Sequence, residues 1–421
     1  MATLSRRNLM RSAAAGAVGL AGAGRYRTAM AQQSQPIKLP IMFSLSGPLA
    51  TVGNPARMGA ELTARMINQN GGFMGRTVEL QFFDDKGTAN DLIAAGREIV
   101  SSGYNYLAGG LISSHFPGLV PLITETKSVY LCGTGSSPAL TNEWYSRYMF
   151  PGTENDLQRG NVLAQLAADK FPDIKRFGCV VSQAQSYIES YKNYQIFCAK
   201  YYGKSGKVPA FDQEQVTKFG TTDFRTVLSQ LAASDADAFY NFVVGADGLT
   251  FWKQARAFNL GNKFKAVIDQ TIDFMVLKIL KQDMPPNLWG LMAWYHGLHT
   301  NDNEMAREFY KAYVAQTNDT LPSGYVQYGN TAVVSMLGAM KQAGGKTDTE
   351  SLINAFETVQ VTTIKGDQYW RKEDHLLICD SDICNIVPTD DSVGAKVVNA
   401  IRYNLKDLSP APNPGKPYKV T

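Results

Sequence analysis

Residues 37–85, IKLPIMFSLSGPLATVGNPARMGAELTARMINQNGGFMGRTVELQFFDD, contain the pattern that decides the fold. The apolar run 37–43 predicts a strand that ends in a turn rich in Ser, Gly and Pro. A helix is expected next, with Asn54 as its N-cap and Pro55 in its first turn, because apolar side chains then recur at helical spacing. Residues 78–83 predict the following strand, so the segment forms one β–α–β unit.

The alternation of strands and helices continues beyond this unit. Further strands are predicted at 104–111, 128–132, 177–181, 208–212, 238–244, 264–268 and 288–295. Helices are predicted at 88–100, 116–126, 157–170, 187–202, 224–233, 249–259, 304–316, 328–343 and 349–358. Residues 366–400 favour antiparallel strands, and the prolines of 409–417 predict an extended tail. The pattern as a whole predicts an α/β fold with parallel sheets covered by helices on both faces.

The first 31 residues have the order of parts of an export signal. SRRNLMR at 5–11 resembles the twin-arginine motif, and the apolar run 12–24 that follows is too short to span a bilayer. Ala29-Met30-Ala31 places small side chains at the two positions that a signal peptidase recognises. These features predict cleavage after Ala31 and a mature protein in the bacterial periplasm. The alternative is the basic N-terminus of a cytoplasmic protein.

The charge of the remaining chain is close to zero. The leader holds five arginines and no acid, so without it the 41 Lys and Arg of the 421-residue chain fall to 36, against 37 Asp and Glu. This balance argues against nucleic acid as a partner, because phosphate binding requires clustered basic side chains. The length suggests two or three domains, and 44% apolar residues are enough to bury a core, which excludes disorder for most of the chain.

The five cysteines are an odd number, so at least one is expected to stay unpaired. Cys379 and Cys384 are expected to form a disulfide in an oxidising compartment, since only a short loop separates them. Zinc binding by this pair is the alternative, although no second Cys or His pair stands at a suitable spacing. Cys132 and Cys179 lie in apolar runs and are expected to be buried.

Motifs of catalysis and cofactor binding are missing from the sequence. It contains no GxxxxGK[ST] loop, no GxSxG elbow and no HExxH pair. Residues 133–138, GTGSSP, have proline where a dinucleotide loop has its third glycine. His296 and His299 have no acidic or cysteine partner nearby. We therefore expect neither a cofactor nor a metal, and a protein that is not an enzyme.

Two short polar loops follow predicted strands and precede predicted helices. Ser113-Ser114-His115 follows the strand 104–111, and Thr134-Gly135-Ser136-Ser137 follows the strand 128–132. Ligands of parallel sheets bind at these strand ends, where hydroxyl and backbone N–H groups can converge on an anion such as a carboxylate. Helix capping alone is the alternative for any single serine, but two such loops in neighbouring units favour a binding site.

Four stretches resemble the branched-chain amino-acid binding proteins, which have the type I periplasmic solute-binding fold. They are IMFSLSGPLATVG (41–53), GAELTARMINQNGGFMGRTVEL (59–80), SSPALT (136–141) and SGYVQYGNTAVVSMLGAMKQAGG (323–345). The resemblance implies two doubly wound parallel-sheet lobes joined by a three-strand hinge, with the ligand cleft between them. It also implies residues 32–153 and 291–365 for lobe one, residues 154–290 and 366–408 for lobe two, and a tail at 409–421.

The same resemblance implies which residues of the first lobe hold the ligand. The family's contacts to the carboxylate and amino groups of the ligand match Ser113 or Ser114 in the first loop. In the second loop they match Thr134 with Ser136, on either side of Gly135.

The second lobe contributes an aromatic side chain and an acid by the same resemblance. The aromatic matches Tyr187, and Tyr325 matches a first-lobe aromatic near the cleft. Asp269 is the first candidate for the acid that holds a ligand ammonium, followed by Gln270 and Asp247.

The family's pocket is altered at two positions. Val52 stands where many members have an aromatic side chain, and Val244-Gly245 replace another.

We expect a periplasmic solute-binding protein that captures a small carboxylate by hinge closure, first of all a branched-chain or other hydrophobic amino acid, and delivers it to an ABC transporter permease. An aromatic or other non-amino carboxylate, or a short amide, is the alternative ligand. A ligand-sensing regulator or a periplasmic enzyme is the alternative from a different class.

N-terminal sequencing of the exported protein tests the leader. The mature chain is expected to begin at Gln32, and replacing both Arg6 and Arg7 with Lys is expected to block export, because the twin-arginine route reads that pair. An exported chain that still begins at Met1 would contradict the cleavage site. Unchanged export of the double Lys variant would point to the general secretory route.

Overall fold

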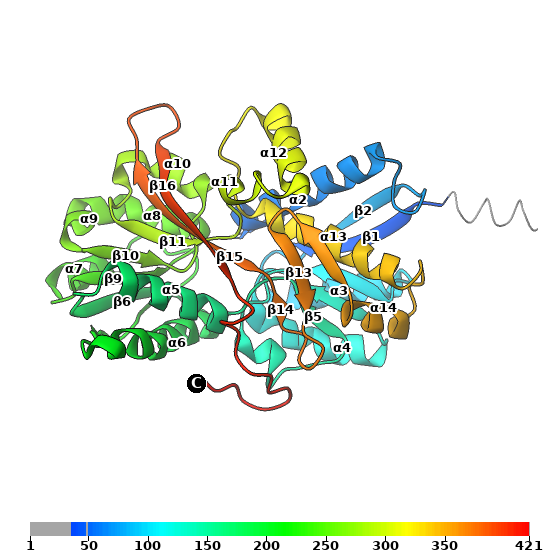
Figure 1. The fold of residues 1–421 in the computed structure, drawn as a ribbon, viewed down its shortest axis with the longest axis horizontal. Coiled ribbons are helices and arrows are strands. Elements are labelled where there is room, and N and C mark those ends of the chain that lie inside the picture. Colours follow the sequence, from blue (N-terminus) through cyan, green and yellow to red (C-terminus); the bar gives the residue numbers. More distant parts are fainter. Residues whose placement is uncertain (1–34, 48, 421) are drawn as a thin grey trace, which may run out of the picture.

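The computed structural model describes residues 35–47 and 49–420. The export signal and its cleavage after Ala31 lie outside the described residues. Figure 1 shows two lobes, each built on its own sheet, with a pair of long strands running from one lobe toward the middle of the molecule. Within the described residues, no helix is both long and apolar enough to cross a membrane.

The first lobe contains a five-stranded parallel sheet with the order β2-β1-β3-β4-β5. Its strands are β1 (Ile37–Phe43), β2 (Val78–Asp84), β3 (Tyr106–Gly109), β4 (Val129–Cys132) and β5 (Met149–Pro151). The helices between them are α2 (Ala50–Gln69), α3 (Ala89–Ser101), η1 (Ser113–Leu119), α4 (Val120–Glu125) and η2 (Pro138–Thr141). Strand β1 is buried at every residue except Lys38, as expected of an inner strand covered on both faces.

Helix α13 (Val326–Gln342) returns to the first lobe and packs on α2. The two backbones approach so closely that a Cβ atom at Gly59 would overlap the carbonyl group of Val326, and one at Gly329 would overlap that of Ala56. Glycine is required at both positions because it has no Cβ. This contact fixes the start of α13 beside the middle of α2.

The second lobe contains an eight-stranded sheet in which antiparallel strands extend a parallel core. The parallel strands are β6 (Arg176–Ser182), β7 (Ala210–Phe211), β8 (Gln215–Thr217), β9 (Ala238–Phe242), β10 (Ala266–Asp269) and β11 (Leu288–Met292). The antiparallel strands are β15 (Asp380–Pro388) and β16 (Ala395–Asn404). Its helices are α5 (Asp156–Lys170), α6 (Gln185–Tyr202), α7 (Arg225–Ala233), α8 (Gly245–Ala255), α9 (Leu260–Lys263) and α10 (Phe274–Leu280).

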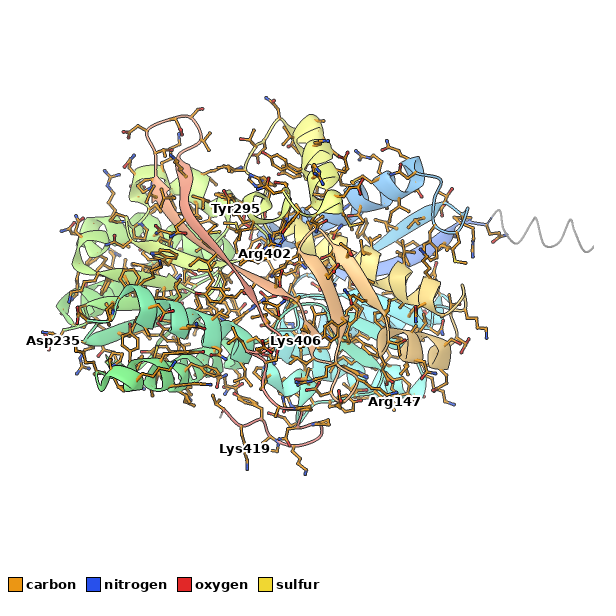
Figure 2. All side chains as sticks on the ribbon, in the orientation of Figure 1. Arg147, Asp235, Tyr295, Arg402, Lys406 and Lys419 are labelled. Atoms are coloured by element: carbon orange, nitrogen blue, oxygen red, sulfur yellow. The ribbon has the colours of Figure 1, made fainter. Side chains whose placement is uncertain are left out.

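The chain passes between the lobes three times. The first passage follows β5, the second follows β11 and leads to α11 (His296–His299) and α12 (Glu304–Thr317), and the third precedes β15. Figure 2 shows Tyr295 of the second passage and Arg402 of β16 near the middle of the molecule, whereas Asp235 and Arg147 lie toward opposite ends of it. These passages are the three connections expected of a hinge.

The third passage lies later in the chain than the sequence predicted. Residues 366–408 were expected in the second lobe, but β13 (Gly366–Trp370) pairs with β12 (Gln360–Thr363) and with β14 (Leu377–Ile378). The indole N–H of Trp370 donates to the carbonyl oxygen of Pro151 at 2.7 Å, which places this small sheet against the first lobe. The passage is therefore near Cys379, because the hairpin turn between β12 and β13 keeps the chain in lobe one.

Several element boundaries also differ from the sequence prediction. Helix α2 begins at Ala50, so Asn54 is not its cap and Pro55 lies inside it. The missing N–H of a proline this close to the helix start removes only one hydrogen bond.

Helix α14 (Thr349–Phe356) confirms the third of the late helices, whereas α10 and the strands β5, β8 and β12 were not predicted. These strands are only three or four residues long and carry little periodicity.

The predicted disulfide between Cys379 and Cys384 is wrong in the structure, where all five cysteines are buried and free. Cys384 lies within the extended strand β15, and Cys379 directly precedes it. Five residues at about 3.3 Å each separate their Cα atoms by roughly 16 Å, far beyond the ~7 Å that a disulfide can span. The segment between them is a strand and not the loop that the sequence suggested.

The C-terminal tail, residues 409–420, has no helix or strand and lies along both lobes. The Ser409 hydroxyl accepts a hydrogen bond from Gln158 of α5 at 2.8 Å. Further along, Gly415 N–H donates to the carbonyl oxygen of Asn142 in the first lobe at 2.7 Å. Lys419 of this tail lies at the lower edge of the molecule in Figure 2.

Peptide mapping under non-reducing conditions tests whether Cys379 and Cys384 are free thiols. Protein isolated from the periplasm is expected to carry free thiols at Cys379 and Cys384. Burial raises the pKa of both thiols, so a thiol reagent should label them slowly in the folded protein and fully in denaturant. A peptide linked through these two residues would contradict the extended course of β15.

Candidate functional site

A cavity lies between the two lobes at the carboxyl ends of the parallel strands. Its free volume is about 60 Å³, several times the ~10–15 Å³ that one water molecule requires on this measure. The first lobe lines it with Leu49, Val52, Leu111, Ile112, Ser113, Thr134, Ser136, Tyr325 and Tyr328. The second lobe lines it with Arg159, Tyr187, Phe242, Val244 and Thr271. An apolar wall with a few convergent polar groups is typical of a small-molecule site.

A larger groove of about 850 Å³ lies between α2, α12 and β16. It is lined mainly by polar and charged side chains, some of which pair with one another, as Arg402 does with Asp302 at 2.8 Å. None of the described residues that line this groove is aromatic. The cavity between the lobes is therefore the stronger candidate.

The hydroxyl groups of the first lobe are brought together by hydrogen bonds between the two polar loops. Ser113, which follows β3, accepts from the backbone N–H groups of Ser136 and Ser137 at 3.0 and 3.1 Å. Thr134 donates its hydroxyl to the carbonyl oxygen of Leu111. Since a hydroxyl can donate one hydrogen bond while it accepts two, Ser113 still has a proton to offer to a ligand.

Aromatic side chains form two stacked pairs on opposite sides of the cavity. Tyr187 at the start of α6 stacks on Phe242 with ring centroids 3.8 Å apart, and Tyr325 stacks on Tyr328 at 5.9 Å. The hydroxyl groups of Tyr325 and Thr271 lie 3.3 Å apart, which joins the lobes across the cavity. Flat, rigid walls from both lobes therefore face the enclosed space.

Arg159 supplies a positive charge to the cavity from the first turn of α5. The turn is fixed by a capping box in which Asn155 and Gln158 exchange hydrogen bonds with each other's backbone N–H. Arg159 is only 8% exposed, and its guanidinium donates to the Thr153 hydroxyl at 3.0 Å. Among residues 35–47 and 49–420, its Nε–H has no hydrogen-bond partner. An arginine with unused donors that lines a cavity is suited to bind an anion.

Glu154 is close to Arg159 but is paired more closely with another cation. Its Oε1 lies 3.0 Å from Nζ of Lys365 and 3.7 Å from Nε of Arg159. Burial opposes ionisation of Glu154, but the charges of Lys365 and Arg159 outweigh it and lower its pKa to about 2. Glu154 is therefore ionised, and its charge is balanced mainly by Lys365.

Two other buried carboxyl groups lie near the cavity without lining it, although Asp156 accepts a hydrogen bond from the wall residue Ser136 at 3.4 Å. Asp156 accepts from the side-chain amide of Gln270 at 3.2 Å, and Asp269 accepts from Asn241 at 2.7 Å and from the N–H of Thr271 at 3.0 Å. Burial raises the pKa of each carboxyl to about 7, in spite of these hydrogen bonds. Neither carboxyl is part of the cavity wall.

The structure brings together only some of the residues that the sequence singled out. The cavity wall includes Ser113, Thr134, Ser136, Tyr187 and Tyr325, and also the two altered positions Val52 and Val244. The residues outside the wall are Ser114, Gly135, Asp247, Asp269 and Gln270.

Each residue outside the wall has a structural reason to be there. Ser114 is exposed on η1, and Gly135 faces the side chain of Leu140. Asp247 accepts from the N–H of Gly220 at 2.8 Å. Asp269 lines a smaller neighbouring pocket of about 20 Å³, and Gln270 bonds Asp156 and Tyr240.

Sequence reasoning missed Arg159, Phe242, Thr271 and Tyr328. Tyr328 follows Tyr325 by three residues, so the helical periodicity of α13 could have placed both on one face. Phe242 is the last residue of β9 and Thr271 follows β10 by two residues, so the rule that ligands meet strand ends could have found both. Arg159 gives no signal in the sequence, because most arginines near a helix start are exposed.

Comparison with known proteins agrees with this architecture. The family described as periplasmic binding protein matches residues 36–391. The chain belongs to the periplasmic binding protein family. The Leu/Ile/Val-binding protein homolog 4 of Brucella melitensis is 25% identical over 390 residues, which cover 87% of this chain and 86% of the relative. Other alignments are shorter and span 53% of homolog 3 from the same organism and 61% of the Escherichia coli Leu/Ile/Val-binding protein.

Solved structures share the fold of this family member at low sequence identity. A solute-binding protein of an ABC transporter from Rhodopseudomonas palustris, in complex with 3,4-dihydroxy benzoic acid, has a TM-score of 0.75 at 19% identity and covers 88% of this chain and 98% of its own. A branched-chain amino acid transporter substrate binding protein from Streptococcus pneumoniae, in complex with isoleucine, has a TM-score of 0.70 at 20% identity, with 88% and 99% covered. The two-lobe fold is therefore shared by proteins with chemically different ligands.

The pH dependence of the free energy of unfolding tests whether the Asp269 carboxyl is buried with a raised pKa. Because its pKa is raised when folded, the folded state holds its proton more tightly, and this stability is lost as pH rises from about 4 to about 7. Asp269→Asn should therefore stabilise the protein at pH 8 by about 1–3 kcal/mol and change little at pH 4. The Oδ1 of Asn241, which has no partner, can accept from the new amide after a side-chain flip.

Urea unfolding at the two pH values measures this effect. Asp235→Asn, at an exposed position of the same lobe (Figure 2), is the control and should change neither value. Equal destabilisation of the Asp269→Asn protein at pH 4 and pH 8 would show that the carboxyl is not the source of the pH dependence.

Proposed function

We propose that this protein is the exported receptor of an ABC importer and that it captures a small carboxylate between its lobes. The single observation that carries the proposal is the cavity, in which hydroxyl groups of lobe one face an arginine and a tyrosine of lobe two. Family membership supports the transport role, since the homologues are ABC substrate-binding proteins. The permease is the partner that the family implies, and the predicted leader supports a periplasmic location.

Capture would proceed by closure of the hinge. The ligand first meets Ser113, whose hydroxyl still has a proton to donate, together with the neighbouring Thr134 and Ser136 on the open first lobe. The second lobe then brings Arg159 and Tyr187 over it, and the ligand stabilises the closed state because only that state makes both sets of contacts. Release follows when the closed form meets the permease and the hinge opens.

Both ligand classes considered from the sequence fit a receptor of this kind. The relatives named for Leu, Ile and Val support an amino acid, and the neighbours that hold benzoate or 3,4-dihydroxy benzoic acid support an aromatic acid. The carboxylate is common to both classes. A reversible binding protein is expected to return either ligand chemically unchanged.

Substitutions on each side of the cavity test capture between the lobes. Ser136→Ala in lobe one and Tyr187→Ala in lobe two are each expected to weaken binding of the same probe by roughly 10- to 100-fold, since each removes contacts worth about 1.5–3 kcal/mol. Benzoate and L-leucine serve as probes, measured by calorimetry. Ser114→Ala is the matched control, because Ser114 is adjacent to Ser113 but outside the cavity.

The control should bind within twofold of the unsubstituted protein. An effect of Ser114→Ala together with silence of Ser136→Ala would contradict the cavity as the site. A Tyr187→Ala protein with unchanged affinity would show that the second lobe takes no part in binding.

A further inference from the structure

The cavity wall contains one permanent charge, the guanidinium of Arg159, and no carboxylate among the described residues that line it. A ligand with an α-ammonium would bring a second positive charge into the same small space. Transfer of an unpaired cation from water into such a site is strongly unfavourable. The positive charge of the cavity wall therefore limits which carboxylates can bind.

The donors of Arg159 are only partly used by the protein. Thr153 accepts one hydrogen bond, and the nearest carboxylate oxygens, on Glu154 and Asp156, lie at 3.7 and 3.8 Å, beyond hydrogen-bond distance. The buried Nε–H has no partner in the part of the chain that the structure describes. An unmet buried donor is costly, and a ligand carboxylate is the natural acceptor for it because the two groups match as planar, two-pronged partners.

Each acid near the cavity is already committed to another group. Lys365 holds Glu154 at 3.0 Å, and Asn241 holds Asp269 at 2.7 Å. Asp156 lies between the amide of Gln270 at 3.2 Å and the hydroxyl of Ser136 at 3.4 Å. None of these three acids lines the cavity in which a ligand ammonium would lie.

The other side chains of the wall indicate the shape and polarity of the part of the ligand that carries no charge. Stacked aromatic pairs face the space from both lobes, and Val52, Val244 and Ile112 complete it with aliphatic groups. Such walls favour a flat, apolar body, which gains from stacking against the rings. Polar contacts come from the guanidinium of Arg159 and from the hydroxyl groups that share the wall with it.

We infer that the solute is a small monocarboxylate with a flat, apolar body and no amino group, and that its carboxylate binds the guanidinium of Arg159. This inference rests on the proposed role as a solute receptor and narrows its ligand class. Arg159 thereby selects against hydrophobic amino acids, which carry the same carboxylate but add an ammonium.

Matched ligand pairs test the selection by calorimetry on the full mature chain. 3-Phenylpropanoate is expected to bind at least 100-fold more tightly than L-phenylalanine, and 4-methylpentanoate more tightly than L-leucine. Amino acids that bind as tightly as their non-amino counterparts would overturn the inference and leave the receptor role standing. Failure of all four, and of benzoate, to bind would overturn the receptor role for carboxylates as well.

The role of Arg159 is tested on the unsubstituted protein and on variants. The unsubstituted protein is expected to bind 3-phenylpropanoate about 100-fold more tightly than the neutral 3-phenylpropanamide, a comparison that does not depend on any variant folding. Arg159→Met should remove this preference and Arg159→Lys should keep part of it. Arg57→Met, at an exposed arginine paired with Glu61, is the control and should keep all of it. Equal affinity of the unsubstituted protein for acid and amide, or a preference that survives in Arg159→Met, would overturn the inference.

Discussion

The buried ion pair between Glu154 and Lys365 is the interaction on which the site depends. Glu154 lies in the first passage between the lobes, Lys365 lies in the hairpin turn between β12 and β13, and the thiol of Cys379 in the third passage is 4.0 Å from the Glu154 carboxylate. Loss of either partner would leave an unpaired buried charge, at a cost of about 3–5 kcal/mol. Because Lys365 is closer to Glu154 than Arg159 is, the pair also leaves Arg159 free to face the cavity.

Closure of the lobes follows from how the binding groups are divided between them. The hydroxyl loops belong to the first sheet, whereas Arg159 and Tyr187 belong to helices of the second. Direct contacts between the lobes include the hydroxyl pair Tyr325 and Thr271 at 3.3 Å and the bond from Ser136 to Asp156 at 3.4 Å. A ligand that bonds both lobes adds to the energy that keeps them together, so ligand binding and lobe closure are linked.

The sequence was sufficient for much of the fold and for half of the site. Periodicity and turn residues predicted the parallel sheets, and the rule that ligands meet strand ends pointed to Ser113, Thr134 and Ser136. The sequence did not show that Asp269 lies outside the cavity wall. Its carboxylate is held by Asn241 of the neighbouring strand β9, and such a contact cannot be read from the sequence. The sequence failed for Arg159 for the same kind of reason, since only the passage from β5 to α5 decides that this side chain lies between the lobes.

A crystal structure of the mature protein with bound benzoate tests the central claim most directly. The account predicts closed lobes, with the benzoate carboxylate about 3 Å from nitrogen atoms of Arg159 and its ring against Tyr187. Benzoate bound elsewhere, or bound in the cavity with its carboxylate turned away from Arg159, would contradict it.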